Sequence, residues 1–293
     1  MATALNEAAI RAASRRERFL ALALFAPILL VVTALLVVPV GWLFGLSFVE
    51  KGEPSLVHYA RMMEYSSYLS ILLMTFRISL IVTLICVILG YPAAYLIAQL
   101  PHRLAMICLA LIIIPFWTSL LVRTYAWLVL LSAKGPINAT LVWLHVTSEP
   151  LDLLFNSTGT VIGMVHIMLP FFTLPLYAQI KSFDMTLLRA AASMGAPPLS
   201  AFLRVFLPLS LPGVSAGAIL VFVQCLAFYV TPAILGGGNV TFAAMKIASN
   251  IQIYFEWGAS SAFGMILLVS ALGMLAFAAR WLGFERALGL VRR

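Results

Sequence analysis

Residues 70–99 read SILLMTFRISLIVTLICVILGYPAAYLIAQ, and Arg77 is the single charged side chain among them. About 20 apolar residues are enough for a helix to cross the hydrocarbon core of a bilayer. A closed β-barrel is the other structure that spans a membrane, but its strands alternate apolar and polar residues over about 10 positions. This run does not alternate, so it predicts a transmembrane helix.

Further runs of the same kind lie on both sides of it. They cover residues 19–48, 104–131, 158–180, 209–235 and 258–279. The whole chain is 63% hydrophobic and 10% charged, whereas a soluble domain carries about 25% charged residues. Prolines within the runs are tolerated, because neighbouring membrane helices can satisfy the freed backbone groups. The sequence therefore predicts an all-α membrane protein with six transmembrane helices.

Basic residues are distributed unevenly between alternate connecting segments. If the N-terminus is cytoplasmic, the inner segments hold Arg11, Arg15, Arg16, Arg18, Arg103, Lys181, Arg189, Arg204, Arg280, Arg286, Arg292 and Arg293. The outer segments then hold only Lys51, Arg61, Lys134 and Lys246. Basic residues accumulate on the cytoplasmic side of membrane proteins, so both termini are predicted to be cytoplasmic. The net charge of +8 then reflects membrane topology and gives no reason to expect a nucleic-acid partner.

This topology divides the chain into three parts. Residues 1–18 form a cytoplasmic N-terminal segment, residues 19–280 form the six-helix domain, and residues 281–293 form a cytoplasmic tail. Within the domain, residues 181–208 form the longest cytoplasmic loop.

The cytoplasmic loop contains signals for a short helix. Asp184 can cap a helix N-terminus with its carboxylate, and Gly195 suits the left-handed position just past a helix end. By helical spacing one face carries Leu187, Ala190, Ala191 and Met194. Pro197 and Pro198 suit the start of a second helix that runs to about residue 206. The first helix either lies in a groove of another protein or packs under its own bundle, and periodicity does not separate the two.

The order Ala190-Ala191, Gly195-Ala196, Leu207-Pro208 and Leu211-Pro212-Gly213 resembles the loop of permease subunits of bacterial binding-protein-dependent ABC importers. The resemblance implies the type I ABC importer permease fold, with this loop as a coupling helix that docks on an ATPase. The docking residues that it implies are Leu187, Arg189, Ala190, Ala191, Met194, Gly195 and Ala196. Arg189 departs from the family pattern, which has a Glu there, and so reverses a charge at the docking surface.

The same resemblance implies the partners of the chain. These are a second permease subunit, two ATPase subunits that carry ATP and Mg²⁺, and a periplasmic or extracellular substrate-binding protein. Residues 115–127, PFWTSLLVRTYAW, with residues 90–95 and 169–177, resemble the spermidine/putrescine permeases in particular. This subfamily implies the bacterial inner membrane and a polyamine-like solute.

Polar and aromatic residues at membrane depth are the candidates for the solute path. They are Trp117, Arg123, Tyr125, His166, Gln224 and Tyr229. Ionisable residues inside a membrane are costly and commonly functional. None of the six runs contains Asp or Glu, and Phe228 and Ala233 stand where polyamine permeases carry acidic residues. Either the partner permease supplies acids for a polyamine, or the solute is an amino acid or organic anion attracted by Arg123.

Other classes of protein fit less well. The chain lacks the glycine-rich phosphate loop of an ATPase, so ATP is expected on a separate subunit and no cofactor on this chain. An ion-driven transporter would favour acidic or histidine relays in its spans, and His166 is the one candidate. The histidines and cysteines are scattered without nucleophile, base or metal-ligand spacing. The sequence therefore predicts neither an enzyme nor a metal site.

Overall fold

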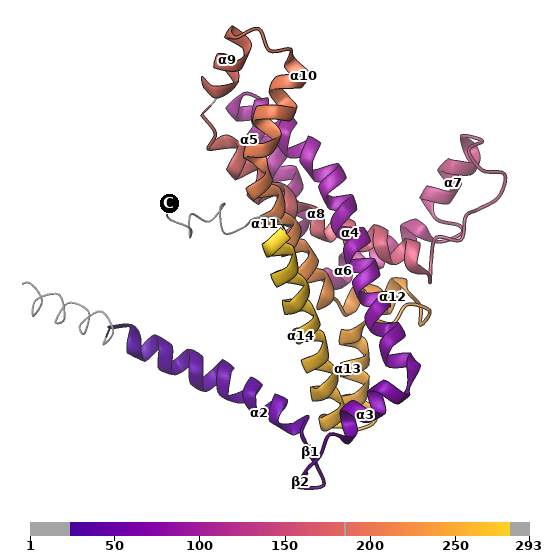
Figure 1. Ribbon diagram of the computed structural model, residues 1–293. Helices are drawn as coiled ribbons and strands as arrows, with labels where there is room; N and C mark the ends of the chain where they lie inside the picture. The colour runs from indigo at the N-terminus through magenta and orange to yellow at the C-terminus, as the bar shows by residue number, and fades with distance from the viewer. Residues whose placement is uncertain (1–23, 185, 282–293) are drawn as a thin grey trace, which may run out of the picture.

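The computed structural model describes residues 24–184 and 186–281, which are helical apart from one small hairpin and the connecting turns (Figure 1). The elements are the helix Leu24–Leu46, which contains η1 (Thr33–Val37) and α2 (Val38–Leu46), then β1 (Val49–Glu50), β2 (Glu53–Pro54), α3 (Val57–Glu64), α4 (Ser66–Gln99), α5 (His102–Ile113), η2 (Ile114–Trp117), α6 (Leu120–Leu131), α7 (Pro136–Trp143), α8 (Ser157–Lys181), α9 (Thr186–Ser193), α10 (Pro198–Ala201), η3 (Phe202–Phe206), α11 (Leu207–Leu226), α12 (Val230–Leu235), α13 (Ala243–Gln252) and α14 (Trp257–Trp281).

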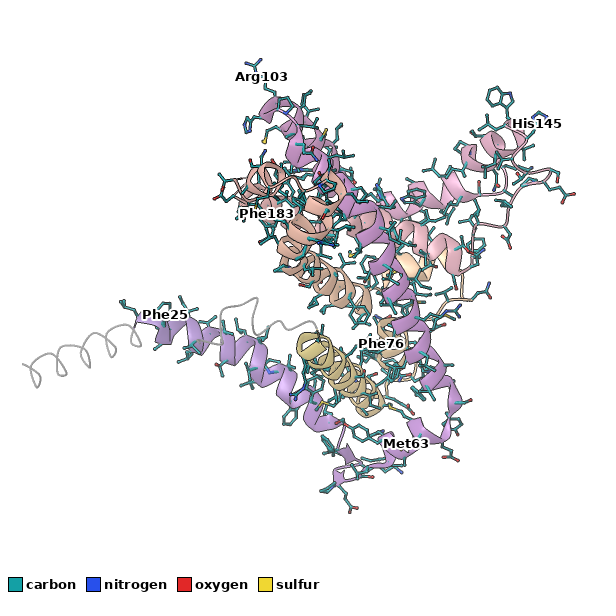
Figure 2. All side chains as sticks on the ribbon, turned by 45° about the horizontal axis from the view of Figure 1, so that its top comes forward. Phe25, Met63, Phe76, Arg103, His145 and Phe183 are labelled. Atoms are coloured by element: carbon teal, nitrogen blue, oxygen red, sulfur yellow. The ribbon has the colours of Figure 1, made fainter. Side chains whose placement is uncertain are left out.

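The bundle has two distinct ends. Figure 1 shows α9 and α10 at one end, and β1, β2 and α3 at the opposite end. Figure 2 places Arg103 at the first and Met63 at the second. We call them the α9 end and the hairpin end.

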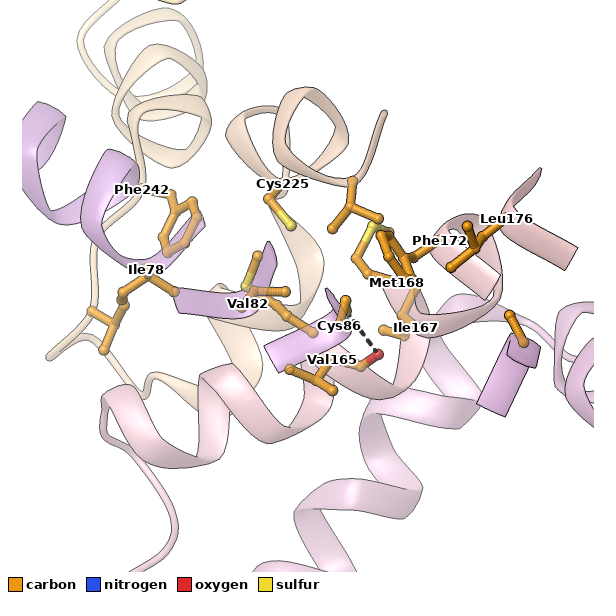
Figure 3. Packing of buried hydrophobic residues seen from close by; sticks show 14 of the residues in the cluster. Ile78, Val82, Cys86, Val165, Ile167, Met168, Phe172, Leu176, Cys225 and Phe242 are labelled. Atoms are coloured by element: carbon orange, nitrogen blue, oxygen red, sulfur yellow. Dashed lines mark hydrogen bonds between the residues drawn. The ribbon is translucent and has the colours of Figure 1, made fainter. Parts of the chain in front are cut away.

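The core lies where α4, α8 and α11 pack against one another. Phe172 of α8 is fully buried there, near Val82 and Cys86 of α4 (Figure 3). A Cβ added to Gly90 of α4 would lie 2.5 Å from the Phe172 ring, and one added to Gly217 of α11 would lie 3.0 Å from it. Small residues thus let the helices approach closely on both sides of one large ring, as is common in membrane bundles.

Within residues 24–184 and 186–281 five helices are long and apolar enough to cross a membrane, and the number is six if one bent pair counts as a single broken span. Helices α4, α8 and α14 confirm the spans predicted at residues 70–99, 158–180 and 258–279 to within a few residues. The first span is the helix Leu24–Leu46, whose hydrophobic stretch buries no residue within the chain. It leaves the bundle and contacts α14 through α2 (Figure 1). The predicted segment 1–18 and the tail from residue 282 lie outside the described residues.

The apolar stretch predicted over residues 104–131 is not one continuous helix but a bent pair of helices. Residues His102–Trp117 and Leu120–Trp143 meet at 99°. Pro115 lies in the 3-10 turn η2, and the chain is extended at Thr118 (φ −92°, ψ 149°). Proline is tolerated within membrane helices in general. Here Pro115 cannot donate a backbone hydrogen bond, the chain is extended at Thr118 and Ser119, and the next helix begins in a new direction.

The span predicted over residues 209–235 is present with different bounds, and the prediction of a separate short helix before it is wrong. The helix is continuous from Pro198 to Leu226. The π-turn η3 lies directly before Pro208, and its wider turn accommodates a residue that has no N–H to donate. The helix ends at Leu226, and α12 and α13 follow as separate short helices. The apolar run extends past the break because the residues of α12 are themselves hydrophobic.

Candidate functional site

Helix α9 is capped at both ends by local hydrogen bonds. The Oδ1 of Asp184 accepts the N–H of Thr186 at 2.9 Å. At the other end Gly195 has a left-handed φ of +81°. Its N–H donates to the Ala192 carbonyl at 2.9 Å, and the N–H of Ala196 donates to the Ala191 carbonyl at 3.1 Å. This pair of bonds is the Schellman motif, so both ends predicted from the sequence are where the helix begins and ends.

The hydrogen bond at the start of α9 also affects the titration of the capping residue. Asp184 is fully exposed, and the hydrogen bond with Thr186 lowers the pKa of its carboxyl below the usual value. The carboxylate form is the one that accepts the backbone N–H. The cap is therefore in place at neutral pH.

The predicted docking face of α9 is open to solvent. Met194 is 87% exposed and Leu187 is 48% exposed. Ala190 is exposed and Ala191 and Ala196 are half-buried, while a Cβ at Gly195 would meet nothing within 4 Å. Arg189 lies in the α9 backbone, and its side chain is outside the described part of the chain. The structure thus brings the predicted residues together on one short exposed helix.

The inner side of α9 reaches a group of rings that the sequence reading did not single out. Leu188 packs against the core together with Phe183. The Phe206 ring lies 5.0 Å from the Tyr95 ring and 5.6 Å from the Phe183 ring, between centroids. Phe202 completes the group, at 5.6 Å from Tyr95. We call Tyr95, Phe183, Phe202 and Phe206 the aromatic cluster.

The aromatic cluster connects three parts of the bundle. Tyr95 belongs to α4, Phe183 to the segment before α9, and Phe202 and Phe206 to η3. The Nζ of Lys181 donates to the Ala98 carbonyl at 2.9 Å and fastens the end of α8 to α4. A displacement of α9 therefore meets packed rings that lead to the long helices. The available signal for this contact was three phenylalanines, Phe183, Phe202 and Phe206, in the predicted cytoplasmic loop.

Arg123, one of the candidate path residues, lies beside the bend in span three. The guanidinium carbon of Arg123 is 5.5 Å from the centroid of the Phe116 ring, within the range of a cation–π contact. Its Nε and Nη1 are buried and have no hydrogen-bond partner among the described residues. His166 of α8 packs edge-on against Trp127 at 5.5 Å between ring centroids, and its Nδ1 is also buried without a partner in the described chain.

Trp127 lies one turn beyond Arg123 on α6, so the two side chains share a face. The middle of the bundle thus contains a guanidinium and an imidazole with unused polar atoms. No carboxylate occurs in the membrane spans of the sequence to pair with them. Buried polar groups are nearly always hydrogen-bonded, so these atoms are candidates to bind a group supplied from outside the chain.

The other candidates are more dispersed. Trp117 is 88% exposed and lines an apolar groove with Phe116 and Phe171. Tyr125 is 56% exposed on α6. Gln224 and Tyr229 are exposed at the end of α11 and the start of α12, and within the described chain neither side chain has a hydrogen bond. Arg123 and His166 are thus the two candidates whose polar atoms are buried in the bundle.

Solved structures of ABC transporters have a similar fold. A crystal structure of a bacterial ABC transporter involved in import of the acidic polysaccharide alginate matches 91% of this chain and 96% of that chain, with a TM-score of 0.75 and 15% identity. The alginate transporter in complex with an alginate pentasaccharide-bound periplasmic protein matches with a TM-score of 0.73, 16% identity and coverage of 93% and 96%. The fold is that of an ABC importer permease, as the sequence predicted.

Sequence relatives define the family more narrowly. The spermidine/putrescine transport system permease protein PotB of Escherichia coli (strain K12) is 34% identical over 257 residues, which is 80% of this chain and 92% of that protein. PotB of Haemophilus influenzae is 35% identical over 194 residues, 66% of this chain and 68% of that protein. The inner membrane ABC transporter permease protein YdcU of E. coli is 28% identical over 234 residues, with coverage of 73% and 72%. A scan against models of known protein families gives no match.

The chain therefore belongs to the family of spermidine/putrescine transport system permeases. It is a multi-pass membrane protein and the permease subunit of an ABC importer, a non-catalytic component of the transport system.

Proposed function

We propose that this permease forms half of the path for a small polyamine-like solute across a bacterial inner membrane and receives the ATPase stroke through α9. The observation that carries the proposal is the construction of α9. A short helix closed at both ends by its own hydrogen bonds is a rigid body, and its exposed face carries Met194 and Leu187. Its inner face meets the aromatic cluster. A push on the outer face would therefore reach α4 and α11.

Charge supports the orientation in this proposal. With the N-terminus cytoplasmic, the inner segments of the sequence hold twelve basic residues, including Arg103 at the α9 end, and the outer segments hold four, including Arg61 at the hairpin end. The positive-inside rule assigns the α9 end to the cytoplasm and the hairpin end to the outside. Both termini are then cytoplasmic, with residues 1–18 and 281–293 as the terminal segments.

The expected assembly contains a second permease, two ATPase subunits that bind ATP and Mg²⁺, and a substrate-binding protein at the hairpin end. The solved alginate transporter supports the last partner, because one of its structures contains a periplasmic protein. This chain would contribute no cofactor or metal ligand of its own.

The polyamine class of solute is supported by the relatives, whose names specify spermidine and putrescine. A second candidate, an amino acid or organic anion, is favoured by Arg123, whose Nε and Nη1 are buried and unpartnered in the described chain. An anion would satisfy these donors, since guanidinium and carboxylate form charge-assisted pairs. For a polyamine, in contrast, carboxylates would have to come from the second permease.

Two exposed methionines at opposite ends allow a matched test of the assembly. Met194 is 87% exposed at the α9 end and Met63 is 88% exposed at the hairpin end. We expect a short thiol cross-linker to join Met194→Cys to the ATPase and Met63→Cys to the binding protein. The three native cysteines, two of them buried, would first be replaced by alanine. A cross-link from Met63→Cys to the ATPase would contradict the proposed orientation. If Met194→Cys gave no cross-link to the ATPase, the proposed docking role of α9 would be wrong.

The solute is tested by calorimetric titration of the binding protein that co-purifies with the complex. We expect binding of spermidine or putrescine at micromolar concentration or below. Binding of an amino acid or organic acid, with none of a polyamine, would instead select the second candidate and leave the importer assignment intact.

A further inference from the structure

One lysine at the hairpin end lies between two tyrosine rings. The Nζ of Lys246, on α13, is 5.3 Å from the centroid of Tyr68 and 5.3 Å from the centroid of Tyr254. Both distances are within the range of cation–π attraction. Among the described residues both ion pairs involve Arg61, so no described carboxylate is paired with this ammonium. The faces of the two tyrosine rings are therefore the groups that stabilise the charge of Lys246.

The two rings are positioned independently of the lysine. Tyr68, in the first turn of α4, packs edge-on against the buried ring of Phe263 at 5.3 Å between centroids. Tyr254 follows α13, and its backbone N–H donates to the Ser249 carbonyl at 3.3 Å, which fixes the backbone that carries the ring. The pair of rings would therefore persist if the lysine side chain rotated away.

The site is accessible and its present occupant is a flexible side chain. Tyr254 is 60% exposed and Lys246 is half-buried. The start of α13 is attached to α4, because the N–H of Ala243 donates to the buried Oγ1 of Thr75 at 2.9 Å. The four-carbon stem of the lysine is free of hydrogen bonds and can leave by rotation about its own bonds. Departure of the ammonium thus requires no movement of the helices.

The occupant has the chemistry of the proposed solute. A lysine side chain is a four-carbon chain that ends in a primary ammonium, and a linear diamine presents the same group on the same kind of chain. Cation–π attraction depends on the charge and not on a directed hydrogen bond, so the rings accept either ammonium. Carboxylates are not needed for such a site, which agrees with their absence from the spans of this chain.

We propose that Tyr68 and Tyr254 form an ammonium-binding site at the outer mouth of the path, which Lys246 occupies in this state and which an alkylammonium group of the incoming solute takes when Lys246 rotates out. The inference rests on the proposed function for its orientation and for its amine solute. A lysine that merely anchors α13 at the membrane interface would also lie near tyrosines, but it would not exchange with an ammonium ion in solution.

The exchange is measured by the reactivity of Lys246 in the purified importer complex in nanodiscs. The amine is acetylated with a small reagent, and peptide mass spectrometry follows Lys246 together with the exposed Lys134 as internal control. Tetramethylammonium is the probe, because it enters aromatic cages and does not react. We expect it to raise the acetylation rate of Lys246 about two- to fivefold over equal sodium chloride, as one cation–π contact of ordinary strength predicts. The rate at Lys134 should not change.

Ring variants separate an exchange site from a passive contact. In Tyr254→Leu, Lys246 should be acetylated faster than in the unaltered protein even without tetramethylammonium, and adding tetramethylammonium should raise the rate little further. Tyr254→Phe keeps an aromatic ring, so its acetylation rates should resemble those of the unaltered protein. With saturating binding protein, putrescine uptake by Tyr254→Leu should be about two- to fivefold slower than by Tyr254→Phe. Equal rates for the two variants, or equal effects of tetramethylammonium and sodium on Lys246, would overturn the site. Failure of the unaltered complex to transport any amine would instead overturn the proposed solute class. The two failures can be distinguished, because the labelling experiment measures acetylation of Lys246 and needs no transport.

Discussion

The α9 loop and the bend in span three both interrupt the membrane helices, but different contacts hold them. The bonds that close α9 join residues within 184–196 of the chain. The local bonds at the bend come from Thr118, whose backbone N–H and hydroxyl both donate to the Pro115 carbonyl, at 3.2 and 2.7 Å. The other contacts of the bend reach across the bundle, since Phe116 packs edge-on against Phe171 of α8 at 4.9 Å between centroids. The first is a self-contained unit, and the second depends on its neighbours.

This difference matches what an importer requires of each region. A helix that receives force from another subunit must keep its own shape, which local caps provide. A region that lines a path must change when the long helices move, and contacts with other helices make that possible. The aromatic cluster lies between α9 and the long helices, since Phe202 and Phe206 of η3 contact Tyr95 of α4 and η3 also contacts α9 and α11.

The largest expected effect is at the aromatic cluster, which connects α9 to the long helices. Phe206 is 2% exposed and contacts Tyr95, Phe183 and Phe202. Phe206→Ala should destabilise the complex by about 3–5 kcal/mol, as removal of a fully buried ring does. It should also reduce uptake more than ATPase binding. Thermal unfolding in detergent and uptake in proteoliposomes check this. The matched control is Phe25→Ala, at a ring that is 61% exposed, and equal destabilisation by both changes would contradict the connection.

The next effect is expected at the end of α9. Gly195 has a φ of +81° with open space around it, so a larger residue is strained by its backbone and not by a clash. Gly195→Val should cost about 1–2 kcal/mol and weaken ATPase association about tenfold. The ATPase recovered with the tagged chain is the measurement. Gly273 also has nothing within 4 Å of an added Cβ but an ordinary φ, so Gly273→Val should retain the ATPase. If the two variants lose it equally, the left-handed turn is not what matters.

The same contrast explains what the sequence could predict. Asp184 and Gly195 determine the ends of α9 by short-range chemistry, so both could be located from the residues alone. The long spans of α4, α8 and α14 could also be predicted, because uniform hydropathy is a local property. Pro115 could not be assigned in this way, since a proline in an apolar run is compatible with a straight, kinked or broken helix until its neighbours are known.

The path was predicted less well for a similar reason. Arg123 and His166 could be proposed singly from their depth, but only tertiary packing places both beside the bend with unpaired nitrogens. Helix α13 was missed because Lys246 and the polar residues after it reduce the hydropathy of a short segment. The ring pair around Lys246 joins residues 68, 246 and 254, a separation that no sequence pattern reveals.

A smaller effect tests the bend. Arg123 is expected to repel an amine solute and to attract an anionic one. For the proposed polyamine, Arg123→Met should therefore leave uptake within about threefold of the unaltered importer, or raise it, because the long apolar side chain keeps the contact with Phe116 and removes an unpaired charge. Arg123→Lys retains the charge and is the matched control. A loss of more than about tenfold in Arg123→Met but not in Arg123→Lys, the loss expected when a charged hydrogen bond is removed, would favour the anionic solute.

The smallest effect is expected at the start of α9, where Asp184 is fully exposed. Hydrogen bonding lowers the pKa of this carboxyl in the folded protein below its unfolded value, so the cap contributes stability above the unfolded pKa and loses it as the pH falls through the folded pKa. Between pH 5 and 8 the carboxylate is ionised in both states, and ATPase association should not vary with pH through this group. Asp184→Ala removes the acceptor and should loosen association modestly at every pH in that range, whereas Asp184→Asn keeps an acceptor for the Thr186 N–H and should lose less. ATPase binding to the three forms at pH 5, 6.5 and 8 is the measurement. A rise or fall across this range in the unaltered protein that disappears in Asp184→Asn would mean that the carboxylate has a partner on the ATPase, and that α9 is held in its groove by charge as well as by shape.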